Sequence, residues 1–223
     1  MPNHTFRCTI LACTPRVAGL MTASLTAVAH AHVGADGGLG HNHDVLGSFM
    51  AGVAHPLAGV DHLAAMVSVG LWSALNLSDE PASSTGRVKR LFSAPLAFAT
   101  TLLIGALMAL QWVSVPGVEP MIAVSLLAMG LLVATRTQLP TALGAALVAG
   151  FALFHGLAHG QEVGGHAAAA LTGMVLSTMA LHTIGIGAGL ALRRHHRWLP
   201  RIAGAGVAAL GLSLLTPAIA GAF

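Results

Sequence analysis

The chain has 223 residues, of which 55% are hydrophobic and only 8% are charged, and its mean hydropathy is +0.79. A soluble domain carries about 25% charged residues, so this composition excludes a water-facing globular protein and indicates an integral membrane protein. The pI near 9.7 is typical of some nucleic-acid binders, but the few basic residues lie in loops between apolar runs. Membrane topology explains them better, and we expect no nucleic-acid partner.

The N-terminal segment 1–31 resembles a secretory signal peptide. Two arginines come before a short apolar stretch at 17–29, and A-x-A cleavage sites occur at 27–29 and 29–31. The apolar stretch is too short to cross a bilayer core of ~30 Å, although an uncleaved first helix is the alternative. Both cysteines lie in this segment, so the mature chain would bind a metal through nitrogen and oxygen ligands.

Residues 32–44 are predicted to form a histidine-rich leader outside the membrane, in the periplasm. Cleavage after Ala31 makes His32 the first residue, so that its imidazole lies beside a free α-amine. Cleavage after Ala29 puts His32 at position three, where square-planar nitrogen ligation of Ni²⁺ or Cu²⁺ is favoured. Both cleavage sites stay open. His41 and His43 follow, either as further metal ligands or as part of a mobile polar segment.

The remaining residues, 45–223, are predicted to form an all-α membrane domain with about six transmembrane helices. Each apolar segment has the ~17–25 residues that one crossing needs, or more. The first segment is long, and we expect it to be broken or re-entrant near Pro56, because proline removes a backbone donor and disfavours helical geometry at the residue before it, His55. The six segments lie at 45–77, 91–113, 118–135, 140–160, 166–192 and 198–221.

Basic residues predict the orientation of this domain. All of those after the signal peptide fall in or next to alternate loops, which the positive-inside rule places in the cytoplasm. Both mature termini are then periplasmic, and the protein is predicted to lie in the bacterial inner membrane. The basic residues are Arg87, Lys89, Arg90, Arg136, Arg193, Arg194, Arg197 and Arg201.

The fourth apolar segment ends in a group of potential metal ligands, His155, His159 and Glu162. On a helix, offsets of 0, 4 and 7 point along one stripe. Two imidazoles at this spacing can chelate one cation, and the carboxylate adds an oxygen ligand one turn further on. The alternative is a buried, hydrogen-bonded histidine pair with a solvated glutamate.

The first apolar segment carries His55, Asp61 and His62. In an unbroken helix the two histidines would lie about 10 Å apart along the axis, too far apart for one ion. A break near Pro56 would let them approach. Asp61 could then ligate directly or orient an imidazole through its other ring nitrogen. Met66 offers a thioether, although ordinary packing explains it better.

One further histidine, His182, stands alone in the middle of the fifth apolar segment. It either adds a ligand to a shared central site or is a hydrogen-bonded core residue, and the sequence leaves both open. Histidine is unusually frequent in the whole chain, with 13 residues against 10 lysines and arginines. This ratio favours metal or proton handling.

The two motifs resemble those of a known family. HPLAGVDHLAAMVSVGLW at 55–72 and FHGLAHGQE at 154–162 are similar to the signature motifs of the HupE/UreJ family of nickel permeases, which are associated with hydrogenase and urease maturation. The likeness extends to the signal peptide, His32, the six crossings and His182. It implies that the metal-handling residues are His55, Asp61, His62, His155, His159 and Glu162.

These observations predict a Ni²⁺ uptake permease that moves the ion from periplasm to cytoplasm and is not an enzyme. Imidazole ligands suit Ni²⁺, Co²⁺ or Zn²⁺ far better than Mg²⁺ or Ca²⁺. The expected partners are the metal ion and the lipid bilayer, and a homo-oligomer is left open. The alternative is an intramembrane zinc-dependent hydrolase in which Glu162 acts as the base. A metal sensor or storage protein is a third reading.

Overall fold

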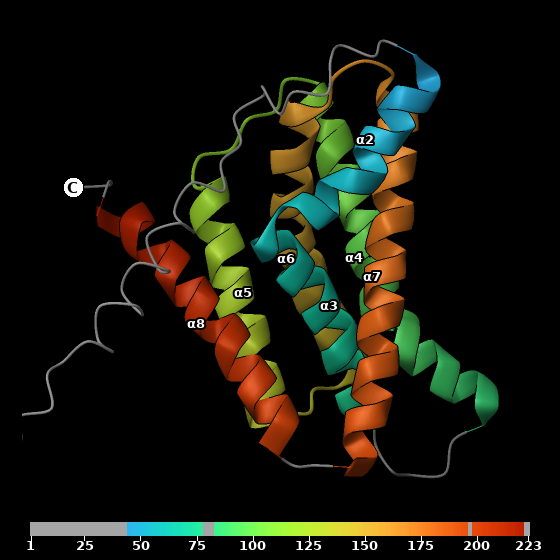
Figure 1. Ribbon diagram of the computed structural model, residues 1–223, viewed down its shortest axis with the longest axis vertical. Coiled ribbons are helices and arrows are strands. Elements are labelled where there is room, and N and C mark those ends of the chain that lie inside the picture. The colour runs from blue at the N-terminus through green and yellow to red at the C-terminus, as the bar shows by residue number, and fades with distance from the viewer. Residues whose placement is uncertain (1–43, 78–82, 196–197, 221–223) are drawn as a thin grey trace, which may run out of the picture. The chain divides into compact units, whose positions relative to one another are not determined.

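Helices make up almost all of the chain that the structure describes. The structure is a computed structural model, and it describes residues 44–77, 83–195 and 198–220. The predictions for the signal peptide, for His32 and for most of the 32–44 leader lie outside these residues. The helices, shown in Figure 1, are α2 (Val45–Ala58), α3 (Val60–Leu75), α4 (Ser84–Leu110), α5 (Val118–Thr135), α6 (Thr141–Glu162), α7 (Ala167–His195) and α8 (Trp198–Ala220).

The helices confirm the predicted all-α membrane fold. Five of them, α4 to α8, are long and apolar enough to cross a membrane. The bent pair of α2 and α3, counted as one crossing, brings the number to six. The second crossing begins at Ser84, earlier than the predicted residue 91. The side chain of Ser83 accepts a hydrogen bond from the Gly86 amide (3.1 Å), so the helix is capped outside the apolar run.

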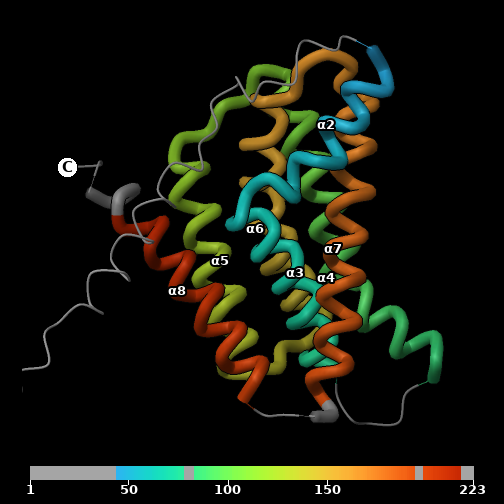
Figure 2. Tube along the Cα trace, in the orientation of Figure 1, coloured from blue at the N-terminus to red at the C-terminus, as the bar shows by residue number. Residues whose placement is uncertain are grey.

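The first crossing is broken, as the sequence predicts, and the break lies at Gly59. The axes of α2 and α3 differ by 81°, and Figure 2 shows the sharp turn of the chain between them. Pro56 is helical and sits in the last turn of α2, whereas Gly59 has an extended backbone with φ −100° and ψ 126°. The break therefore comes three residues after the proline that signals it.

The helices associate mainly as close pairs. In Figure 1, α4 packs on α6, α5 packs on α8, and α2 and α3 both pack on α7. Glycine permits these approaches: a Cβ on Gly156 of α6 would overlap the Leu102 carbonyl of α4, and one on Gly70 of α3 would overlap the His182 carbonyl of α7. Small residues have this function in membranes, where helix association depends on backbone proximity and van der Waals contact.

Hydrogen bonds fix the end of α3 that lies away from the break. The Trp72 indole donates to the Thr137 carbonyl (3.1 Å), and the Asn76 side chain both donates to and accepts from the backbone of Leu139 (3.0 and 2.8 Å). A guanidinium N–H of Arg193 donates to the Ala74 carbonyl (3.2 Å). These bonds bring the end of α3 together with the end of α7 and with the α5–α6 connection. The sequence predicts all three on the same side of the membrane, so they can meet.

Candidate metal centre

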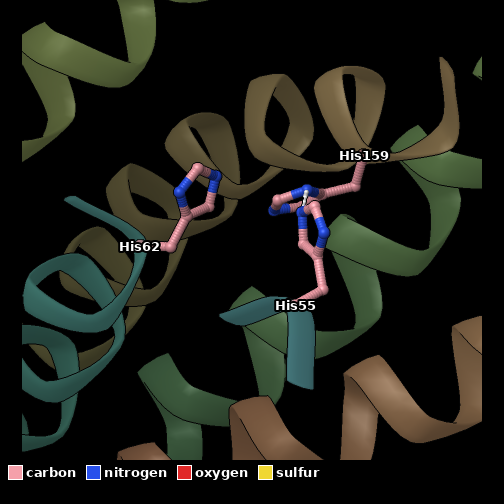
Figure 3. Close-up of side chains that lie close together, drawn as sticks. All are labelled: His55, His62 and His159. Carbon is pink, nitrogen blue, oxygen red and sulfur yellow. Dashed lines mark hydrogen bonds between the residues drawn. The ribbon is translucent and has the colours of Figure 1, made fainter. Parts of the chain in front are cut away.

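Three histidines from three helices converge on one point. In Figure 3 the rings of His55 of α2 and His159 of α6 meet, and the ring of His62 of α3 lies to one side of them. One ring nitrogen from each lies within 4.8 Å of the others. His55 Nε2 and His159 Nδ1 share a hydrogen bond of 2.8 Å. We call these residues the three-histidine cluster.

The bend between α2 and α3 brings two of these histidines together. His55 and His62 would be about 10 Å apart along a straight helix, but their ring centroids are 5.9 Å apart. Gly59 lies between the two helices, and a Cβ on it would come within 2.6 Å of Asp61 Oδ1 and 2.8 Å of His62 Nδ1. Its backbone conformation is open to any residue, so glycine supplies space for the Asp61–His62 pair.

Asp61 orients the imidazole of His62. Its Oδ1 accepts a hydrogen bond from His62 Nδ1 at 2.9 Å. Because a carboxylate accepts, the proton is on Nδ1, and the neutral ring then carries its lone pair on Nε2. This is the contact that metal-binding histidines commonly make with a carboxylate. Of the two functions considered for Asp61, the geometry matches the orienting one.

Glu162 lies at the exposed rim of the cluster. Its Oε2 is 3.5 Å from His55 Nε2, and its side chain is 58% exposed, against 34% for His55. His159 is only 1% exposed. The potential metal ligands therefore range from the exposed carboxylate of Glu162, at the end of α6, to the buried imidazole of His159. A cation reaching this end of the helices would meet Glu162 and His55 first.

His155 lies one turn before His159 on α6 and is completely buried. Its ring centroid is 6.0 Å from that of His62, but it is outside the three-histidine cluster. Its Nδ1 donates to the Phe151 carbonyl (3.0 Å), which leaves the lone pair on Nε2. The Nε2 atoms of His155 and His159 are both buried without a hydrogen-bond partner in the described part of the chain.

His182 lies outside the three-histidine cluster. Its Nδ1 donates to the Met66 carbonyl (2.7 Å). The ring of Phe98, from α4, contacts it at a centroid distance of 5.0 Å and also contacts His155 at 5.5 Å. Met66 is fully buried beside His182, so its sulfur is not part of the cluster.

Phe98 is the neighbour that sequence reasoning missed. A phenylalanine in an apolar segment carries no signal of a special position, and only the packing of α4 reveals its contacts. With His155 and Ser125 it lines a cavity of about 10 Å³, whose other walls are Ala65, Val69, Met129, Val148 and Phe151. A cavity of this size holds about one water molecule.

The donors suit a borderline transition metal. Imidazole nitrogen is a ligand of Ni²⁺, Co²⁺ and Zn²⁺, whereas Mg²⁺ and Ca²⁺ prefer sites built from several oxygens. The cluster offers three imidazoles and a carboxylate at its rim. An isolated ionisable side chain is costly in a membrane. A cluster of several such side chains within apolar helices therefore indicates a functional site.

Comparison with known proteins agrees with the motifs. A family model described as HupE / UreJ protein matches residues 18–214. Protein HupE of Rhizobium leguminosarum bv. viciae is 36% identical over 201 residues, which cover 88% of this chain and 94% of that protein. No solved structure matches the chain. The matches span nearly all of both proteins, and the chain therefore belongs to the HupE/UreJ family.

Proposed function

We propose that this protein is a Ni²⁺ uptake permease of the bacterial inner membrane and that the three-histidine cluster is the site where the ion enters. The family is associated with nickel and cobalt transport that serves hydrogenases and ureases, and it does not favour the hydrolase alternative. The observation that carries the proposal is the convergence of imidazoles from two separate crossings within 4.8 Å. The ion is the cargo, and the site performs no chemical conversion.

The geometry supports binding that is selective and reversible. The buried Nε2 of His159 lacks a hydrogen-bond partner among the described residues, and such a nitrogen costs about 1–3 kcal/mol. A cation bound at Nε2 would offset this cost, and a cation bound between His55 and His159 would use the Nδ1 of His159, which faces His55. Release stays feasible because His55 and Glu162 are partly exposed and a transport site must let its ion leave.

The proposed direction follows from the basic residues. In Figure 1 the start of α2 and the end of α6 lie opposite the ends of α5 and α7. Arg136 caps the end of α5 and Arg193 lies near the end of α7, so the positive-inside rule makes the start of α2 and the end of α6 periplasmic. Glu162 and His55 then face the periplasm. In this proposal His32 and the rest of the leader before Asp44, which lie outside the described residues, deliver the ion to this rim, and both mature termini are periplasmic.

The test is ⁶³Ni²⁺ accumulation in cells that produce the wild-type protein, His62→Ala or His159→Ala. Each substitution removes one member of the cluster, so uptake should fall to the level of cells without the protein. His166→Ala is the matched control, because this exposed histidine contacts Ser48 through its backbone amide alone. Wild-type uptake by both cluster variants would refute the proposal. Competition by unlabelled Co²⁺ and Zn²⁺ would measure selectivity.

A further inference from the structure

A second group of buried side chains that could bind a metal lies between α3 and α7, away from the three-histidine cluster. His182 and Thr178 are one turn apart on α7, Met66 is on α3, and each is 0% exposed. Thr178 Oγ1 donates to the Met66 sulfur (3.4 Å), and His182 Nδ1 donates to the Met66 carbonyl (2.7 Å). One imidazole, one thioether and one hydroxyl are therefore held together inside apolar helices.

The imidazole of His182 is prepared as a ligand. A backbone carbonyl can only accept a hydrogen bond, so the contact with Met66 puts the proton on Nδ1 and leaves the lone pair on Nε2. That Nε2 is buried and has no hydrogen-bond partner within the described residues. Metal-binding histidines commonly donate their other N–H to a carbonyl in this way. For a histidine that only stabilises the fold, an unpartnered buried nitrogen is a cost.

A series of rings connects this group to the three-histidine cluster. The ring centroid of His62 is 6.0 Å from that of His155, His155 is 5.5 Å from Phe98, and Phe98 is 5.0 Å from His182. His155 repeats the arrangement of His182, with Nδ1 bound to a carbonyl and Nε2 unpartnered within the described residues. The cavity of about 10 Å³ beside His155 and Phe98 gives this part of the series some free space.

We propose that His182, Met66 and Thr178 form a second, inner metal position, which receives the ion from the three-histidine cluster past His155 and Phe98. This inference rests on the proposed transport function and extends it to the inward half of the route. Imidazole and thioether ligands favour Ni²⁺ and other borderline or soft cations over Mg²⁺ and Ca²⁺. Phe98 separates the two positions, so its ring must move aside for the ion to pass.

The experiment compares transport with binding. Initial ⁶³Ni²⁺ uptake is measured in proteoliposomes, and equilibrium ⁶³Ni²⁺ binding is measured on the same purified variants in detergent. His182→Ala should slow uptake by roughly 10–100-fold, the range typical of losses at a metal site, while binding to the three-histidine cluster is retained. Met66→Leu and Thr178→Val, which nearly preserve shape, should slow uptake by smaller factors. Retained binding also shows that each variant is folded.

Thr183→Ala is the matched control. Thr183 follows His182, is exposed, and donates only to the Met179 carbonyl of its own helix, so its loss should leave uptake unchanged. If His182→Ala, Met66→Leu and Thr178→Val all transport like this control, the inner position is refuted and the proposed function stands. It is also refuted if His182→Ala loses binding together with uptake while the other two variants behave as wild type. Absence of uptake by the wild-type protein would overturn both proposals.

Discussion

The two crossings that carry the histidine motifs present them in different ways. α6 is continuous, and its helical period alone places His155 and His159 one turn apart on the face that is buried in the bundle. The first crossing is divided into α2 and α3, and its 81° bend is what brings His55 and His62 near each other. A continuous helix fixes the spacing of its ligands, whereas a broken one can bring distant residues to a single point.

The difference also concerns what supports each pair of histidines. On α6 the support is packing, because Gly156 lets α4 approach the helix closely. At the break the support is polar, because Asp61 holds His62 by a hydrogen bond of 2.9 Å. Irregular backbone at membrane depth is tolerated where it is enclosed by protein or lines a polar site, and the break adjoins the three-histidine cluster. Substitutions on the two crossings should therefore have different consequences.

The largest effect on metal affinity is expected from Asp61→Asn at the break. Asparagine keeps the size of the side chain but removes the negative charge that strengthens and orients the imidazole. Loss of such a supporting contact typically weakens metal binding by about 10–100-fold. Equilibrium ⁶³Ni²⁺ binding to the purified protein measures it. Asp44→Asn is the control, because Asp44 caps α2 at the Gly47 amide (2.8 Å) and asparagine caps equally well. Equal affinities in the two variants would contradict the orienting function.

A smaller loss of affinity is expected from Gly59→Ala. The backbone conformation suits alanine, but the new Cβ would lie 2.6 Å from Asp61 Oδ1 and 2.8 Å from His62 Nδ1. Both side chains must shift, and because they can rotate, we expect several-fold weaker ⁶³Ni²⁺ binding without loss of the fold. Gly150→Ala on α6 is the control, since nothing lies near its Cβ position. Wild-type affinity in Gly59→Ala would show that the glycine is dispensable for the site.

The smallest effect on affinity is expected from Gly156→Ala on the continuous crossing, where the change should appear in stability instead. The added methyl group overlaps the Leu102 carbonyl, so α4 and α6 must separate. Overpacking of this kind costs about 1–3 kcal/mol. Thermal unfolding in detergent should show a lower midpoint than Gly150→Ala, while Ni²⁺ affinity of the folded fraction stays close to wild type. A variant as stable as Gly150→Ala would mean that the two helices can adjust freely.

The number and type of crossings could be predicted because they depend on local composition. Each apolar run that can span the bilayer appears as a helix, or as the bent pair, in the described residues. Pro56 predicted the break in the first crossing. Its place at Gly59 was not predictable from the proline, because a helix can include a proline near its C-terminal end and turn only where the next residues allow it.

The candidate site was predictable in part. The positions of His155, His159 and Glu162 along α6 follow from helical periodicity. The membership of the three-histidine cluster does not follow, because it depends on how α2, α3 and α6 are rotated relative to each other. His182 shows what the sequence could not predict. Its complete burial fits its place in the middle of an apolar segment, but its contact with Phe98, a ring of another helix that also contacts His155, depends on how the helices pack.

The sequence by itself determined a helical membrane protein and a break in its first apolar segment, and it supplied a set of candidate metal ligands, because hydropathy, proline and side-chain chemistry act within short segments. The tertiary structure decided which histidines meet, which carboxylate orients an imidazole and which aromatic ring separates His155 from His182. These relations depend on close contacts between helices far apart in the sequence, and such contacts are set by the fit of whole helix surfaces rather than by any local pattern.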